Sequence, residues 1–182
     1  MTLSLGFFAS QPTVNTTDLD LLNPNDNSLA KLDSRLDAVD ELVKRSKRIG
    51  IAEPVQIVIS ELELSSKFSD WSTTRDDQIV KFSDSRAAMK ANELIFVGLV
   101  KLAGQEFHYR ADILLRIEAA EFHLEIRRFQ IGQLFTPRLL RAAVSKLISL
   151  SIEAGLPRSP IDIETLLISE RGLVISGATI GI

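Results

Sequence analysis

Apolar and polar residues alternate along the middle of the chain in the manner of β-strands. Between Glu106 and Ile117, Phe107 and every second residue after it are apolar, and the residues between them are polar except for Leu114. The segment from Glu121 to Arg127 repeats this alternation. A period of two places alternate side chains on opposite faces of a strand. We therefore predict two strands, each with one dry face and one wet face.

These two strands are expected to form a hairpin with Ala119 and Ala120 as the connection. That register matches dry face with dry face and wet face with wet face, which specifies an antiparallel pairing. The predicted pairs are Leu115 with Leu124 and Ile113 with Ile126 on the dry face, and Asp112 with Arg127 and Arg116 with His123 on the wet face.

Two irregularities indicate the shape of the sheet. The run from Leu94 to Leu102 is apolar on both faces, as expected of a central strand that is covered from both sides. After Arg128 the apolar positions shift to Phe129 and Ile131, which is typical of a β-bulge where a sheet bends. We expect the strands from Ile79 to Ile131 to form one curved sheet.

Helical spacing appears in the first third of the chain. One face of a helix is indicated by five apolar residues that recur at alternating intervals of three and four, namely Leu29, Leu32, Leu36, Val39 and Val43. Asn27 or Ser28 is the predicted N-cap and Gly50 the predicted end. The other face is polar, so the helix is amphipathic.

Two further helices are predicted. After a short strand from Val55 to Ile59, the sequence Ser60-Glu61-Leu62-Glu63 has the pattern of a capping box, and its helix is expected to end near Ser72. Thr136-Pro137 suits the start of a third helix that ends at Gly155.

Runs of strands bracketed by helices, without βαβ alternation, indicate an α+β fold with an antiparallel sheet. A closing hairpin is predicted from Ile161 to Ser169 and from Leu173 to Ile180. We predict a curved antiparallel sheet wrapped around the long C-terminal helix, with the amphipathic helix before it. Residues 28–182 are expected to form one domain. Residues 1–27 are a predicted tether, whose first nine residues form a terminal strand or the remnant of a signal or anchor.

Composition excludes some classes of function. The chain has 182 residues, of which 45% are hydrophobic, and a formal net charge of −3. The acidic balance argues against a nucleic-acid partner. The absence of cysteine excludes disulfides, thiolate chemistry and cysteine metal sites. The two histidines, His108 and His123, are predicted to lie too far apart along the hairpin to share a metal ion.

The search for catalytic groups is also negative. The sequence has no zinc-protease, nucleophile-elbow or phosphate-loop signature. The carboxylates that could form a pair are predicted to lie in a turn or to face water; they are Asp76, Asp77, Asp112, Glu125, Asp162 and Glu164. We predict no metal, no cofactor and no enzymatic activity. A small enzyme with a polar cluster inside the cavity remains a third hypothesis.

Two groups of residues are candidates for binding. Large apolar side chains on the concave face would line a cavity for a hydrophobic ligand, or simply form core; the candidates are Trp71, Leu94, Phe96, Phe107, Tyr109, Ile113, Phe122, Leu124, Leu140, Val144 and Leu147. The basic residues Lys44, Arg45, Lys47 and Arg48 end the first helix. They either complement the helix dipole or contact anionic headgroups.

Three segments resemble a family of bacterial envelope proteins, the YpmS and LmeA-like proteins. They are the strand and helix start from Gln56 to Leu64, the segment Phe129-Gln130-Ile131-Gly132-Gln133-Leu134-Phe135-Thr136-Pro137, and the closing hairpin that ends in Arg171-Gly172-Leu173-Val174-Ile175-Ser176-Gly177. The resemblance implies a tubular-lipid-binding-like architecture, a location at the cell envelope and no catalytic residues. The chain departs from the family at its N-terminus, where Met1 to Ala9 is too short to span a bilayer.

The leading hypothesis is therefore non-enzymatic binding of a lipid or another elongated hydrophobic ligand at the bacterial cell envelope, near a membrane surface. The alternative is a ligand-free structural or interaction module that docks a partner through the amphipathic helix 29–49.

Overall fold

The computed structural model describes residues 14, 16–17, 19–74, 81–102, 105–118, 121–132, 134–135, 161–170 and 172–181. Within them lie two helices and eight strands. In chain order these are α1 (Asp26–Ile49), β1 (Pro54–Ile59), α2 (Glu61–Thr74), β2 (Lys81–Lys90), β3 (Glu93–Leu102), β4 (Gln105–Glu118), β5 (Glu121–Ile131), β6 (Leu134–Phe135), β7 (Ile161–Ser169) and β8 (Gly172–Thr179).

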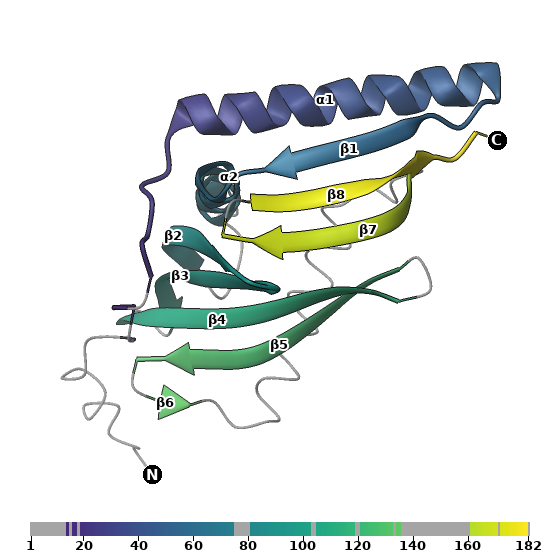
Figure 1. Cartoon of the computed structure of the whole chain (residues 1–182). Coiled ribbons are helices and arrows are strands. Elements are labelled where there is room, and N and C mark those ends of the chain that lie inside the picture. Colours follow the sequence, from purple (N-terminus) through teal and green to yellow (C-terminus); the bar gives the residue numbers. More distant parts are fainter. Residues whose placement is uncertain are drawn as a thin grey trace, which may run out of the picture.

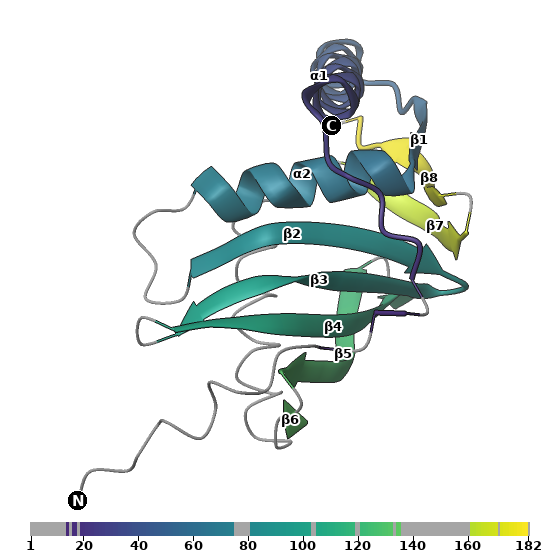
Figure 2. The ribbon, with the colours of Figure 1, turned by 90° about the vertical axis from the view of Figure 1, so that its left-hand side faces the viewer.

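The strands form two antiparallel sheets. Sheet A has the order β1-β8-β7, and sheet B has the order β2-β3-β4-β5-β6. Figure 1 shows α1 lying along sheet A, and Figure 2 shows α2 lying along β2 of sheet B. The class α+β is therefore correct, with the helices in the N-terminal half of the chain.

The predicted architecture is wrong. One curved sheet around a C-terminal helix was expected, but the strands divide into two flat sheets, and the C-terminal end of the described chain is the hairpin of β7 and β8. β8 pairs with β1, so that Ile57 lies opposite Ile175. Periodicity reports which face of a strand is dry and not which distant strand pairs with it, and this pairing was therefore missed. The helix predicted from Thr136 to Gly155 lies outside the described residues.

The predicted hairpin of β4 and β5 is confirmed. Leu115 pairs with Leu124, Ile113 with Ile126 and Arg116 with His123. The bulge is confirmed as well, because the register shifts at Arg127. This extra residue places Asp112 opposite Arg128, so the predicted pair of Asp112 with Arg127 is wrong by one residue.

Two further bulges lie beside glycines. β2 shifts register between Ser83 and Arg86, opposite Gly98, and β7 shifts between Ile163 and Thr165, beside Gly177. A Cβ atom on Gly98 would lie 2.8 Å from the Ser83 carbonyl oxygen. Because a bulge pushes backbone toward the neighbouring strand, these two positions have no room for a side chain.

Local capping chemistry sets the helix ends. The Asn25 side chain accepts a 2.8 Å hydrogen bond from the Ser28 N–H, so the N-cap of α1 lies two residues before Asn27, the nearer of the two predicted caps. Gly50 ends α1 in the left-handed conformation, as predicted. The capping box of α2 is confirmed, since Glu63 Oε2 accepts the Ser60 N–H at 2.9 Å and Ser60 Oγ accepts the Glu63 N–H at 3.3 Å. α2 ends two residues after Ser72.

Each helix also covers the outer edge of a sheet. Glu61 Oε2 accepts the Met89 N–H at 2.7 Å, and Ser65 Oγ accepts the Ala87 N–H at 3.2 Å, both on the β2 edge. On the β1 edge, Arg35 of α1 donates to the Val58 carbonyl. Edge strands carry unpaired backbone groups that invite association, so these contacts protect both sheets.

The main core lies between the inner face of sheet B, sheet A and the two helices. Its buried members come from both sheets and from α1, and Leu64 and Phe68 of α2 pack against them partly buried; the buried members are Leu32, Ile59, Met89, Leu94, Val100, Tyr109, Ala111, Ile113, Phe129, Ile168 and Leu173. β3 is covered on both faces, as predicted. Its outer residues Ile95 and Val97 form a second cluster with Ala88, and Leu19 and Leu21 of the N-terminal segment pack on it.

Candidate ligand-binding site

The structure brings several of the predicted cavity residues to one place, the inner face of sheet B. Leu94, Tyr109 and Ile113 are buried there, and Phe96 and Phe107 are partly buried against them. Trp71 approaches from α2. The side chains of Phe122 and Leu124, and the whole of Leu140, Val144 and Leu147, lie outside the part of the chain that the structure describes.

At the α2 end, the aromatic side chains pack on one another. Phe68 lies 4.3 Å from Phe96 and 5.5 Å from Trp71 between ring centroids, and Phe82 meets Tyr109 edge-on at 5.2 Å. Burial raises the pKa of the Tyr109 hydroxyl, and its hydrogen bond with Ser85 Oγ at 3.1 Å opposes that rise only in part. These rings form core rather than the lining of a cavity.

An open hollow of about 530 Å³ lies at the other end of sheet B, beside β7. It is lined by the β2–β3 turn, the last part of β4, the bulge of β5 and one residue of β7; these are Ala91, Asn92, Glu93, Leu114, Leu115, Arg116, Ile117, Arg127 and Leu166. The Asn92 N–H donates to the Ile168 carbonyl at 3.2 Å, which fixes the turn against β7. The hollow therefore sits where sheet A meets sheet B.

Most of the exposed lining of this hollow is polar, but a few apolar side chains at its base are continuous with the core. Leu115 and Leu166 are partly buried and pack against the main core cluster. Ile117 lies one step further along the inner face of β4. Leu114, the apolar residue that interrupts the alternation of β4, faces outward and is 5% exposed.

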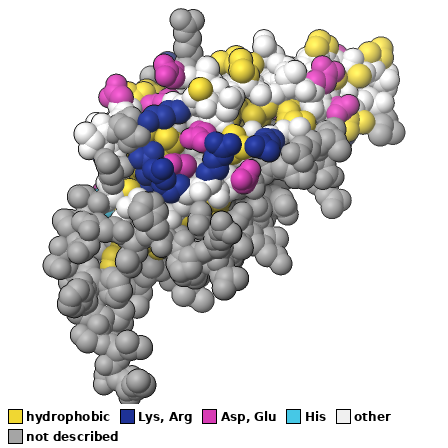
Figure 3. Space-filling model, turned by 60° about the horizontal axis from the view of Figure 1, so that its bottom comes forward, with side chains coloured by type: hydrophobic (Ala, Val, Ile, Leu, Met, Phe, Trp, Pro, Cys, Tyr) yellow, Lys and Arg dark blue, Asp and Glu magenta, His cyan; other side chains and the backbone are white. Residues whose placement is uncertain are grey.

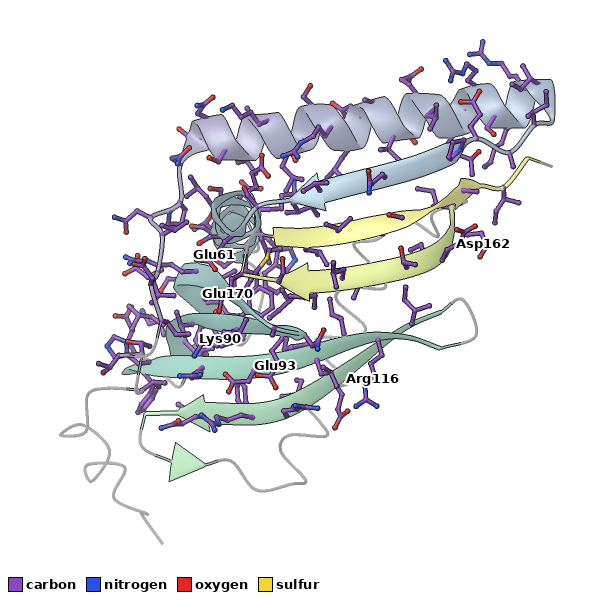
Figure 4. All side chains as sticks on the ribbon, in the orientation of Figure 1. Glu61, Lys90, Glu93, Arg116, Asp162 and Glu170 are labelled. Atoms are coloured by element: carbon purple, nitrogen blue, oxygen red, sulfur yellow. The ribbon has the colours of Figure 1, made fainter. Side chains whose placement is uncertain are left out.

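The rim of the hollow carries two guanidinium groups. Arg127 Nη1 lies 2.8 Å from Glu93 Oε1, and Arg116 Nη2 lies 4.0 Å from Glu125 Oε2. Both arginine side chains are about half exposed, at 48% and 52%. Figure 4 shows Arg116 near the end of β4 and Glu93 at the start of β3. The Arg116 ion pair is long, so its guanidinium can take an anionic ligand without breaking a tight contact.

Three other charged groups on the outer face of sheet B, those of Arg110, Asp112 and Arg128, pair with one another. Arg110 Nε lies 2.7 Å from Asp112 Oδ1, and Arg128 Nε lies 3.5 Å from Asp112 Oδ2. Figure 3, seen from this side, shows Lys and Arg side chains gathered with Asp and Glu side chains among them. Asp112 was predicted to face water, but it is 6% exposed because these two arginines enclose it.

A second open hollow, of about 550 Å³, lies between α1 and α2 and is lined by Ala30, Lys31, Ser34, Arg35 and Glu63. Its two central charged groups already have partners, since Arg35 pairs with Glu63 and donates to the Val58 carbonyl. Burial would raise the pKa of Glu63, but the Ser60 N–H, Arg35 and the Ser60 hydroxyl together hold it below its usual value. These groups therefore stabilise the fold.

The basic residues at the end of α1 divide into two pairs. Lys44 pairs with Asp40 and Glu41, and Arg45 pairs with Glu53. These hydrogen bonds raise the pKa of both cations. Lys47 and Arg48 are exposed, and neither has an ion-pair partner among the described residues.

Metal chemistry finds little support in the described part of the chain. His108 is exposed on the outer face of β4, and the backbone register places His123 opposite Arg116, as predicted. Among the residues described, no group of three or more His, Asp or Glu side chains is placed to hold a metal ion.

The sequence pattern did not single out Arg116, Arg127 and Leu166, which line the hollow beside β7. The available signal was Leu114, an apolar residue on a wet face, with Arg116 two positions further on the same strand. The sequence pattern did not indicate that β7 lies beside the end of β4, because Leu166 comes from the other sheet.

Comparison with known proteins gives no further guide. No family model, curated protein or solved structure matches this chain. Neither of the two described helices has the length and apolar character needed to cross a bilayer.

Proposed function

We propose that this protein binds, without catalysis, an amphiphile with an apolar chain and an acidic headgroup, such as a fatty acid or an acidic lipid. The observation that carries the proposal is the hollow at the junction of the sheets, where three apolar side chains, Leu115, Ile117 and Leu166, lie in a mostly polar lining beside two half-exposed arginines. Ligand sites commonly combine an apolar lining with a few polar groups that fix orientation.

The apolar chain would lie on Leu115, Ile117 and Leu166. Leu115 and Leu166 already touch the core, so a ligand there would extend the core outward and remove apolar surface from water. Ile126, which lies opposite Ile113 one step along the same face, is also only partly buried. The junction thus contains apolar surface that a ligand can cover.

The acidic headgroup would bind Arg116, with Arg127 beside it. A planar guanidinium can donate two parallel hydrogen bonds to a carboxylate or phosphate. Arg127 is already paired with Glu93, so it adds positive charge beside the headgroup. Arg116 contacts the headgroup directly.

The envelope location and the relation to YpmS and LmeA-like proteins belong to this proposal. The motif order from Gln56 onward supports them. The resemblance implied one sheet wrapped around a helix, but the described strands form two sheets. We therefore take from the resemblance only the class of ligand and the location.

The docking role considered for the amphipathic helix has less support than ligand binding. Leu32 and Val43 of its apolar stripe are buried within the chain, and Leu36 is the most exposed of the five residues that define the stripe, at 37%.

Fluorescence titration with cis-parinaric acid and with its methyl ester tests the proposal. The wild type should bind the acid more tightly than the ester. Arg116→Ala should weaken binding of the acid about tenfold, the loss expected for one charge-assisted contact, and leave the ester unchanged. Lys101→Ala, an exposed cation at the opposite end of the same sheet face, is the control.

A second pair of variants tests the apolar side chains of the hollow. Leu166→Ser should weaken both probes, and its neighbour Leu167→Ser, 59% exposed on the opposite face of β7, should weaken neither. Thermal melts confirm that both variants fold. Equal affinity for acid and ester, or no binding of either, would contradict the proposal.

A further inference from the structure

A second surface, distinct from the hollow, gathers exposed isoleucines at the turn between α1 and β1. Ile49 and Ile51 flank Gly50 and are 51% and 61% exposed. Ile180, which follows β8, is 39% exposed. Gly181 lies against the Ile51–Ala52 backbone, since a Cβ atom there would be 2.8 Å from the Ile51 carbonyl carbon. Figure 1 shows the C-terminal end of the described chain beside this end of α1. We call these three isoleucines, with Lys47 and Arg48, the α1 tip.

A buried network of hydrogen bonds fixes the backbone of the α1 tip. Ser46 Oγ binds both the Ile51 carbonyl and Thr179 Oγ1, and Ser46 and Thr179 are 0% and 2% exposed. Thr179 Oγ1 also accepts the Glu53 N–H at 2.8 Å, and the Thr179 N–H donates to the Glu53 carbonyl at 2.9 Å. The turn is therefore fixed to β8, and the isoleucines are exposed by a well-anchored backbone rather than by a fraying end.

The cations of α1 that have acidic partners precede the α1 tip along the helix. Asp40 and Glu41 lie back from the tip and neutralise Lys44, and Glu53 neutralises Arg45. Lys47 and Arg48, which are exposed and unpaired among the described residues, lie next to Ile49. The uncompensated positive charge thus lies beside the exposed apolar side chains.

We infer that the α1 tip binds the surface of an anionic lipid membrane. Aliphatic side chains gain by leaving water for the interfacial region of a bilayer, and adjacent cations gain from anionic headgroups. An acidic protein surface would suit the cations, but it would leave three isoleucines against polar groups. The inference rests on residues that the hollow does not use, and it holds whether or not the hollow binds a ligand.

Sedimentation with lipid vesicles tests this inference. The full chain should bind vesicles of phosphatidylcholine and phosphatidylglycerol in equal amounts at least tenfold more tightly than vesicles of phosphatidylcholine alone, and added salt should weaken the binding. Ile51→Ser combined with Ile180→Ser, and separately Lys47→Gln combined with Arg48→Gln, should each weaken it about tenfold.

Matched controls lie elsewhere on the molecule. Leu167→Ser removes an equally exposed apolar side chain from sheet A, and Lys31→Gln removes an exposed cation from the start of the same helix. Both should bind vesicles like the wild type.

Three results would overturn the inference: equal binding of the wild type to neutral and anionic vesicles, wild-type binding by both tip variants, or losses in the controls as large as in the tip variants. Light scattering without vesicles gives a fourth, since a dimer that the isoleucine variant abolishes would assign the α1 tip to a second copy of the chain. The parinaric acid titration needs no membrane, so its failure would leave this inference intact.

Discussion

The Tyr109 hydroxyl lies in the apolar interior with Ser85 Oγ 3.1 Å away, and both residues are at most 2% exposed. A buried hydroxyl that loses its partner keeps the cost of leaving water, which is about 1–3 kcal/mol. Ser85→Ala should lower the free energy of unfolding by about that amount. Adding Tyr109→Phe should restore much of the loss, because no polar atom is then left unpaired. Urea denaturation of the two single variants and the double variant measures this coupling, and strictly additive losses would contradict it.

A single residue, Glu63, makes the free energy of unfolding depend on pH. Burial acts to raise its pKa, but the Ser60 N–H, Arg35 and the Ser60 hydroxyl outweigh it, and the pKa is lower in the folded chain than in the unfolded chain. As the pH falls, the unfolded chain takes up this proton first. The stabilisation is therefore present above the ordinary glutamate pKa of about 4.3 and is lost as the pH falls toward the folded-state pKa.

Glu63→Gln isolates this charge, because glutamine also fits a capping box. The wild type should exceed the variant in stability near neutral pH, and the difference should shrink in acid. Urea midpoints across the acid range measure it, and a difference that stays constant throughout would exclude the assigned role.

At the scale of elements, the helices protect sheet edges by side-chain contacts. Glu61→Ala should free the Met89 N–H on β2, cost about 1 kcal/mol of stability and increase self-association, since an open edge can pair with another chain. Thr73→Ala is the control, because the Thr73 hydroxyl donates to the Ser69 and Asp70 carbonyls of its own helix. Light scattering against concentration measures the effect, and equal association of the two variants would argue against edge protection.

The sequence pattern predicted individual helices and strands better than it predicted how they are arranged. Capping residues and strict alternation act between neighbours, so α2, the β4–β5 hairpin and its bulge were predictable from local pattern. The start of α1 was missed by two residues, because Asn25 caps the helix from a stretch with several candidate capping residues.

At the scale of the whole molecule, the shared core should make the two sheets unfold together. Ile168 of sheet A is 3% exposed and packs in the main cluster with residues of sheet B. Ile168→Ala should therefore cost about 2–4 kcal/mol, as expected for a buried aliphatic truncation. Leu167→Ala, at the exposed neighbouring position, should cost little.

Hydrogen exchange extends this comparison across the sheets. Amides of β4 should lose protection in Ile168→Ala to the same extent as amides of β8, because one core serves both sheets. Unchanged protection in β4 would show that the sheets unfold independently.

The proposed binding site belongs to this largest scale. Arg116 and Leu115 could be assigned to opposite faces of one strand from the sequence alone, but their shared border with Leu166 exists only because β7 of sheet A lies against sheet B. Likewise, Gly181 lies against the Ile51 backbone, far away along the chain, because β8 pairs with β1.

The sequence by itself determined the properties that arise between near neighbours: the α+β class, the inner apolar face of β4, the register of the β4–β5 hairpin up to its bulge and the capping box of α2. These follow from backbone periodicity and from hydrogen bonds that span a few residues. The tertiary structure alone decided that the strands divide into two sheets, that β1 pairs with β8, and which exposed side chains meet at the hollow and at the α1 tip. Many strands with similar apolar patterns can pair, and only the joint packing of the whole chain selects among them.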